Sequence, residues 1–159
     1  MPTADVTLRD AIRAIGAGCY ALQARKTANL LARLYNRAVA DLGLEMSQAS
    51  TLFLIAAGQG ETVVRAAAQL GVERSTLSRN LAVLARGGLI ARGPGGSAGY
   101  RLTAAGLAMA DKALPRWRAA QELIEARIAS SGAPDPRPAM RALRRAAHDA
   151  RDASPSSLA

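Results

Sequence analysis

The sequence predicts a mainly α-helical protein, built as one domain or as one lobe with an attached arm. Half of its 159 residues are hydrophobic but only 3% are aromatic, so the core must consist mostly of Leu, Ala, Val and Ile. This composition favours closely packed helices over a β-sandwich. Apolar residues also recur at spacings of three and four, which is the period of a helix face. A chain of this length can bury a core without a metal or disulfide staple.

Charge indicates a polyanionic partner. Twenty-one Lys and Arg against 12 Asp and Glu give a net charge of +9. Nucleic acid is the commonest partner of a strongly basic globular domain, although a merely basic, soluble surface has the same composition. The longest strongly apolar run, residues 52–57, is too short to cross a bilayer. The first ten residues lack the pattern of a signal peptide, so we expect a cytoplasmic protein without membrane contact.

The N-terminal part is predicted to form two helices or one kinked helix. A seam with spacings of 4, 3, 4 and 3 is formed by Leu8, Ile12, Ile15, Cys19 and Leu22. After Lys26 the stripe resumes at Leu30, Leu34, Ala38 and Leu42. Gly16 and Gly18 weaken the middle of the segment, and Gly43 is expected to end it.

Capping residues and glycines then divide the chain into short helices. Ser47 is predicted to cap a helix that runs to about residue 57. Thr62 is predicted to cap the next helix, residues 63–70, which Gly71 ends.

A further helix and a hairpin follow directly. Ser75 is predicted to cap a helix that ends at the glycines of residues 87–88. Residues 89–92 and 100–102 are predicted to be short strands, and the glycine-rich residues 93–99 are expected to form the loop between them.

Two helices complete the chain. Thr103 is predicted to cap a long one that Gly132 ends, with a kink or break at Pro115 because proline lacks a backbone donor. Asp135 followed by Pro136 is typical of a helix start. The last helix carries apolar residues on one side and, towards the other, Arg137, Arg141, Arg144 and Arg145.

Residues 62–90 carry the most informative pattern, because a helix, a tight turn and a second helix precede the first strand. A small residue at Ala67 lets the helices cross closely, and Gly71 permits a left-handed turn. The second helix is held to the core by Leu77, Leu81 and Leu84. Its exposed face then consists of Ser75, Arg79, Ala82 and Arg86.

This exposed face suits a helix that enters the DNA major groove. Short side chains allow close approach, Arg reads guanine, and Ser or Thr reaches phosphates and bases. The alternative is an ordinary solvated helix face. The helix-turn-helix spacing, the hairpin that follows it and the basic charge together favour DNA binding.

Several segments are similar to one known family. They are STLSRNLAVLARGGLI at residues 75–90, RLTAAG at 101–106, ARKTANLLARLYNRAVADLGLEMSQASTLFLIAA at 24–57 and ALPRWRAAQELI at 113–124. The first two resemble the winged helix-turn-helix of the MarR family of bacterial regulators, the third resembles that family's first two helices, and the fourth resembles its long fifth helix. The resemblance implies a homodimer whose N- and C-terminal helices interlock. It also implies repression or activation of nearby genes, usually relieved by a small molecule or an oxidant.

The resemblance assigns DNA contacts to the second helix of the motif. Those contacts are Ser75, Thr76, Ser78, Arg79 and Asn80, with Arg74 before the helix and Arg86 at its far end as backbone contacts. Asn80 has a second interpretation, in which it braces the helix against the core. The family's wing usually carries an Asp and then an Arg that enters the minor groove, and residues 93–100 have neither. Only Arg92 and Arg101 remain as basic wing residues, which puts minor-groove reading in doubt.

The resemblance also suggests a site for a signal. Some members sense peroxide through a cysteine in the first helix, so Cys19 is a candidate redox switch, with inert packing as the alternative. Aromatic side chains that could line an effector pocket, or simply fill the core, are Tyr20, Tyr35, Phe53 and Trp117.

The chain is not expected to be an enzyme. One cysteine excludes an internal disulfide, and a single histidine argues against a zinc site and against the common catalytic triads. The GPGG sequence lacks the Lys and hydroxyl residue of a phosphate-binding loop. No metal or cofactor is therefore expected.

We therefore predict a mainly α fold with a winged helix-turn-helix lobe over residues 45–103. Residues 1–44 and 104–159 form a discontinuous helical dimerisation arm. The predicted function is a dimeric, sequence-specific regulator that binds a pseudo-palindromic double-stranded operator, a repressor released by a small molecule or an oxidant. The alternative is a winged-helix protein used for effector-independent DNA architecture or for protein binding.

Overall fold

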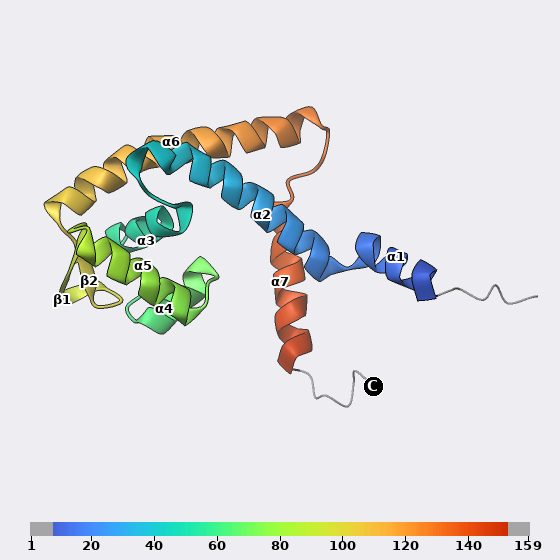
Figure 1. The fold of residues 1–159 in the computed structure, drawn as a ribbon, viewed down its shortest axis with the longest axis horizontal. Helices are drawn as coiled ribbons and strands as arrows, with labels where there is room; N and C mark the ends of the chain where they lie inside the picture. The colour runs from blue at the N-terminus through green and yellow to red at the C-terminus, as the bar shows by residue number, and fades with distance from the viewer. Residues whose placement is uncertain (1–7, 153–159) are drawn as a thin grey trace, which may run out of the picture. The chain divides into compact units, whose positions relative to one another are not determined.

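The computed structural model describes residues 8–152, apart from the side chains of residues 17, 94–96 and 152. It shows a mainly helical chain with a two-stranded antiparallel hairpin, as predicted (Figure 1). The chain divides into two compact units, Met1–Ala120 and Gln121–Ala159. Across residues 8–152, no helix is both long and apolar enough to span a membrane. The outer ends of the two predicted dimerisation segments, residues 1–7 and 153–159, lie outside the described residues.

The N-terminal seam belongs to two helices rather than one. Helix α1 spans Leu8–Gly18 and α2 spans Tyr20–Val39. Cys19 separates them in an extended conformation, with φ −77° and ψ 110°. The break is confined to this residue, because its N–H still donates to the carbonyl of Ile15 and its carbonyl accepts from the N–H of Gln23, both at 3.0 Å. The spacing of the seam predicts that Cys19 lies within a helix. In the structure Cys19 instead lies between the two helices and directly precedes α2.

A short 3-10 helix, η1 (Ala40–Leu42), ends at Gly43 as predicted, and Gly43 is left-handed with φ 67°. Helix α3 (Met46–Ala56) follows. The predicted cap at Ser47 is wrong, because the extended residue is Glu45 and Ser47 already lies in the first turn. The N–H of Glu45 donates to Oε1 of Gln48 at 3.0 Å, so the start of α3 is satisfied without the serine hydroxyl.

Helix α4 (Val63–Leu70) begins and ends as predicted. Oγ1 of Thr62 accepts from the N–H of Arg65 at 3.2 Å, and Gly71 adopts φ 65°. Helix α5 (Arg74–Arg86) begins earlier than expected. Glu73 is its extended cap residue and its carbonyl accepts from the N–H of Thr76, so the predicted cap at Ser75 is wrong. The turn between α4 and α5 is therefore only three residues long.

The hairpin consists of β1 (Ile90–Ser97) and β2 (Tyr100–Leu102). Strand β1 extends through most of the predicted 93–99 loop, which contracts to a turn at Ala98 and Gly99 with φ 52° and 79°. Both Arg92 and Ser97 pair with Tyr100, so β1 bulges between them. The N–H of Ala98 donates to the carbonyl of Gly60 at 2.7 Å, which ties the hairpin turn to the segment before α4.

Helices α6 (Ala104–Ser130) and α7 (Arg137–Asp152) complete the described chain. Of the predicted kink or break at Pro115, the break is wrong, since α6 continues through this residue; one missing donor is tolerated within a long helix. Thr103 caps α6 as predicted, because its Oγ1 accepts from the N–H of Gly106 at 3.0 Å. Oδ1 of Asp135 accepts from the N–H of Arg137 at 3.0 Å, which confirms the predicted start at this site. The Arg137 guanidinium lowers the pKa of Asp135 by hydrogen bonding to it.

One hydrophobic cluster holds α3, α4, α5 and the start of β1 together and includes the last residue of α2. Its most deeply buried large side chains are Leu52, Leu77, Leu84 and Val39. The buried leucines of α5 all lie on one face of the helix, which packs on the cluster. The opposite face of α5 is left to solvent. The cluster thereby fixes which side of α5 is available for binding.

Two contacts connect α2 and η1 with the first half of α6. The rings of Tyr35 and Trp117 stack with their centroids 6.4 Å apart. The Arg116 guanidinium forms a fork with the Asp41 carboxylate, in which Nε donates to Oδ1 at 2.9 Å. That hydrogen bond lowers the pKa of Asp41. These contacts hold α6 against the helix that leads into the α3–α5 cluster.

Candidate nucleic-acid interface

Helix α5 presents the predicted residues to solvent. Leu77, Leu81 and Leu84 are buried beneath it. Ser75, Arg79, Ala82 and Arg86 are all exposed on the opposite face. Arg74, in the first turn of α5, and Ser78 are also exposed. The two sets of residues follow from the 3.6-residue period, because leucines at intervals of three and four can all face the core.

Arg79 lies at the middle of this exposed face. Its Nη2 is 3.5 Å from Oγ1 of Thr76, one turn earlier on the same helix. Thr76 is half-buried and so contributes its hydroxyl from the edge of the face. This contact directs the guanidinium along the helix surface towards the N-terminal turn of α5.

Asn80 differs from the other candidate contacts. Only 9% of its surface is exposed, and it lies on the leucine side of α5. Its burial agrees with the alternative interpretation, in which Asn80 braces the helix against the core. In contrast, Val83 is 40% exposed and lies four residues after Arg79 on the outer face. An apolar residue there can contact a thymine methyl group, and sequence reasoning missed it because valine is usually buried.

The crossing of α4 and α5 depends on small residues. Ala66 and Ala67 are buried at the start of the motif. A Cβ atom on Gly60 would lie 2.8 Å from Cβ of Ala66, so only glycine fits at this approach, and its φ of 75° also favours glycine. The Gly60 carbonyl holds the hairpin turn, so the same close contact positions both parts of the lobe.

The hairpin carries the two remaining candidate residues. Arg92 and Arg101 are both exposed. Cζ of Arg92 lies 4.9 Å from the centroid of the Tyr100 ring, and Arg101 extends alongside Gly93. The base of the hairpin is fixed to the turn that follows α5 through Thr103, whose Oγ1 donates to the carbonyl of Gly88 at 2.7 Å.

The charge of this part of the chain is entirely positive. Residues 74–102 contain five arginines and no Asp or Glu. All five belong to α5 or to the hairpin, namely Arg74, Arg79, Arg86, Arg92 and Arg101. Glu73, directly before Arg74, is the acidic residue next to this segment in the sequence, so the positive charge of α5 and the hairpin is available for phosphates mainly beyond the first turn of α5.

The three candidate residues for a signal site are not brought together within one chain. Cys19 is half-buried at the break between α1 and α2, and Tyr20 beside it is 75% exposed. Trp117 instead stacks on Tyr35, near the other end of α2. Fifteen residues of helix separate Tyr20 from Tyr35, a rise of about 22 Å. No group of His, Cys, Asp and Glu within residues 8–152 is arranged to hold a metal ion.

Comparison with known proteins identifies similar sequences and folds. Residues 42–99 match the MarR family. The transcriptional regulator MosR of M. tuberculosis is 32% identical, with a TM-score of 0.70 over 87% of this chain and 99% of that one. The structure of MosR in complex with DNA is 36% identical, with a TM-score of 0.69 over 82% of this chain and 98% of that one.

A more distant structure shares the fold alone. The MarR family protein Rv2887 of M. tuberculosis, in complex with p-aminosalicylic acid, is 22% identical, with a TM-score of 0.57. That match covers 84% of this chain and 98% of Rv2887. No protein of curated function matches the sequence.

Proposed function

The chain belongs to the MarR family of transcriptional regulators, and from this premise we propose that it is a homodimeric repressor. It binds a pseudo-palindromic operator in double-stranded DNA and is released by a small molecule or an oxidant. The observation that carries the proposal is the exposed face of α5, where Arg79 lies at mid-helix within a segment of five arginines and no acidic residue. Residues 45–103 form the DNA-binding lobe. Residues 1–44 and 104–159 form the dimerisation arm.

Selection from a random duplex library tests this function directly. The purified full chain is expected to enrich two half-sites in inverted repeat, with centres about 10 base pairs apart. Repeating the selection at two salt concentrations separates sequence reading from charge attraction, since only the latter falls steeply with salt. Tight, salt-sensitive binding without an enriched motif would instead support DNA architecture. The irregular wing favours that second function, because it lacks the family's usual Asp and Arg. Absence of DNA binding would support protein binding.

Dimerisation follows from apolar surface that the described chain leaves exposed. Leu8, Ile12 and Ile15 of α1 are 77%, 58% and 58% exposed and lie along one stripe. Leu30 of α2, together with Met140 and Leu143 of α7, is also exposed. Such stripes on helices are buried at two-fold interfaces, where the same surface serves both subunits.

Sedimentation velocity at micromolar concentration is expected to show a dimer. Ile12→Asp places a charge on the stripe and should shift the protein to monomer. Ala14→Asp adds the same charge to an exposed residue on the other side of α1 and should leave the dimer intact. A stable wild-type monomer would contradict the proposed assembly and the palindromic operator with it.

Two features support a signal that releases the repressor. The Tyr35–Trp117 stack places two aromatic rings together between α2 and α6, and aromatic rings are typical of the lining of small-molecule sites. Cys19 is half-buried at the only residue that separates α1 from α2, where a change in its chemistry can alter how the helices meet. If an oxidant is the signal, peroxide should weaken operator binding by wild type but not by Cys19→Ser. If peroxide leaves operator binding by both proteins unchanged, an oxidant is not the signal, and a small molecule remains as the proposed signal.

A further inference from the structure

We propose that Tyr100 and Gly93 are positioning residues for the hairpin. They hold Arg92 and Arg101, which lie on opposite faces of the hairpin, so that each presents its charge to a DNA phosphate. The inference rests on the proposed DNA-binding function and deepens it. It gives this irregular wing a way to bind the DNA backbone without the Asp and Arg that are usual in the family.

The register of the hairpin separates the two arginines. Arg92 pairs with Tyr100, and Ala91 pairs with Arg101. Because successive side chains of a strand point to opposite faces, Arg92 and Tyr100 share one face while Ala91 and Arg101 share the other. The arginines therefore act on different sides of the hairpin.

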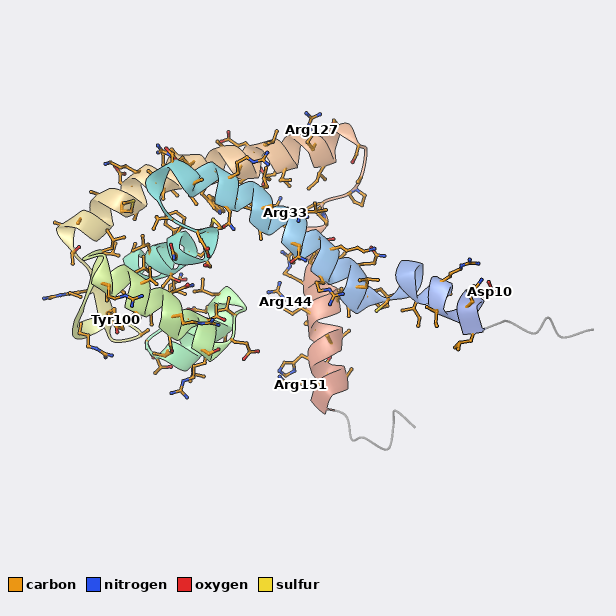
Figure 2. All side chains as sticks on the ribbon, viewed as in Figure 1. Asp10, Arg33, Tyr100, Arg127, Arg144 and Arg151 are labelled. Atoms are coloured by element: carbon orange, nitrogen blue, oxygen red, sulfur yellow. The ribbon has the colours of Figure 1, made fainter. Side chains whose placement is uncertain are left out.

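The Tyr100 ring supports the Arg92 guanidinium. Cζ of Arg92 lies 4.9 Å from the ring centroid, within the distance of a cation–π contact. Tyr100 is half-buried and packs against the core, so the ring itself is anchored (Figure 2, where Tyr100 is labelled on the hairpin). The exposed Arg92 is thus held by a fixed neighbour in the free protein, and it retains its charge for a phosphate.

Gly93 leaves the space in which Arg101 lies. A Cβ atom at residue 93 would be 3.0 Å from Nε and 3.1 Å from Cδ of Arg101. The Arg101 side chain therefore crosses the open face of the glycine, and an added Cβ would force it to shift by a few tenths of an ångström. The backbone of Gly93 is outside the left-handed region, so alanine is compatible with its conformation and only the space is removed.

These contacts reduce the freedom that each arginine loses on binding. A long side chain free in solvent gives up rotamer entropy when it is fixed on a phosphate. Stacking on Tyr100 and packing over Gly93 impose part of that restriction before DNA arrives. Both residues should therefore affect DNA affinity only through their arginine partners, and equally on all sequences, since phosphate contacts carry no direct base readout.

Double-mutant cycles on the full dimer test the proposal. Dissociation constants are measured across a salt series on the selected operator and on random duplex. The single variants are Gly93→Ala, Tyr100→Leu, Arg92→Ala and Arg101→Ala. The double variants are Gly93→Ala/Arg101→Ala and Tyr100→Leu/Arg92→Ala. Each arginine variant should flatten the slope of log affinity against log salt by about 0.9 for every phosphate that it no longer neutralises. Tyr100→Leu should weaken binding about two- to fivefold per half-site. Tyr100→Phe keeps the ring and should bind like wild type.

The decisive results are the couplings. Gly93→Ala should weaken binding in the wild-type background but have no effect once Arg101 is alanine, and Tyr100→Leu should have no effect once Arg92 is alanine. If Gly93→Ala and Tyr100→Leu weaken DNA binding just as much in the arginine-to-alanine backgrounds, the positioning role is overturned. Thermal unfolding of each variant shows whether it has kept its fold. A wild-type protein without DNA affinity would overturn the proposed function as well. Wild type that binds, together with Gly93→Ala and Tyr100→Leu variants that bind equally well, would overturn this inference alone.

Discussion

Replacing Arg79 with alanine is expected to weaken operator binding by about 1–3 kcal/mol per half-site and up to twice that for a dimer. Arg79 lies at the centre of the exposed face of α5, where its guanidinium can reach the edge of a guanine. Removing a bidentate hydrogen bond to a base reduces both affinity and discrimination. Fluorescence anisotropy on the selected operator and on scrambled duplex would measure both quantities.

Arg127→Ala is the control for the change in charge. Arg127 is an exposed residue in the last turn of α6, outside the proposed DNA-binding lobe (labelled in Figure 2). The Arg127→Ala variant loses the same charge as Arg79→Ala. It should leave the ratio of the affinity for the operator to the affinity for scrambled duplex unchanged. If Arg79→Ala weakens operator and scrambled duplex equally, Arg79 contacts phosphate, and base reading must come from other residues.

Replacing Gly106 with alanine is expected to destabilise the fold by about 1–3 kcal/mol or more. An added Cβ would lie 1.8 Å from the carbonyl oxygen of Leu89 and 2.8 Å from its carbon. Both are backbone atoms at the start of the hairpin, so neither can move aside as a flexible side chain can. The same Leu89 carbonyl accepts from the N–H of Thr103 at 3.1 Å, so the clash would disturb the junction of hairpin and α6.

Denaturant unfolding of Gly106→Ala measures this destabilisation. Gly16→Ala is the matched control, because Gly16 lies within α1 and its added Cβ meets no atom within 4 Å. That variant should be neutral or more stable by up to about 1 kcal/mol, since alanine favours helix over glycine. Equal stability of Gly106→Ala and wild type would mean that the first turn of α6 does not pack against the hairpin as closely as the structure shows.

The helix-turn-helix is predictable from the sequence because its signals are local. Thr62, Gly71 and the three leucines of α5 act through spacings of a few residues. Side-chain preference places the caps of α3 and α5 on Ser47 and Ser75, whereas Glu45 and Glu73 occupy them. Which residue takes the extended cap conformation depends on the length of the preceding turn, and tertiary packing sets that length.

The hairpin is less predictable because its details depend on pairing. A glycine-rich segment is typical of a loop, yet β1 runs on to Ser97, which pairs with Tyr100 after the bulge that follows Arg92. The contacts of Arg92 with Tyr100 and of Arg101 with Gly93 follow from a register that no local pattern specifies. Asn80 is ambiguous in the sequence for a related reason, since its burial depends on how α5 rotates against the core.

Parallel DNA selection with wild type and Arg79→Ala tests most directly whether α5 reads sequence. Wild type is predicted to enrich an inverted repeat. The variant is predicted to enrich the same repeat with one base pair per half-site relaxed, because the substitution removes only that guanidinium from the interface. Identical motifs from the two proteins, or no motif from wild type, would contradict the account.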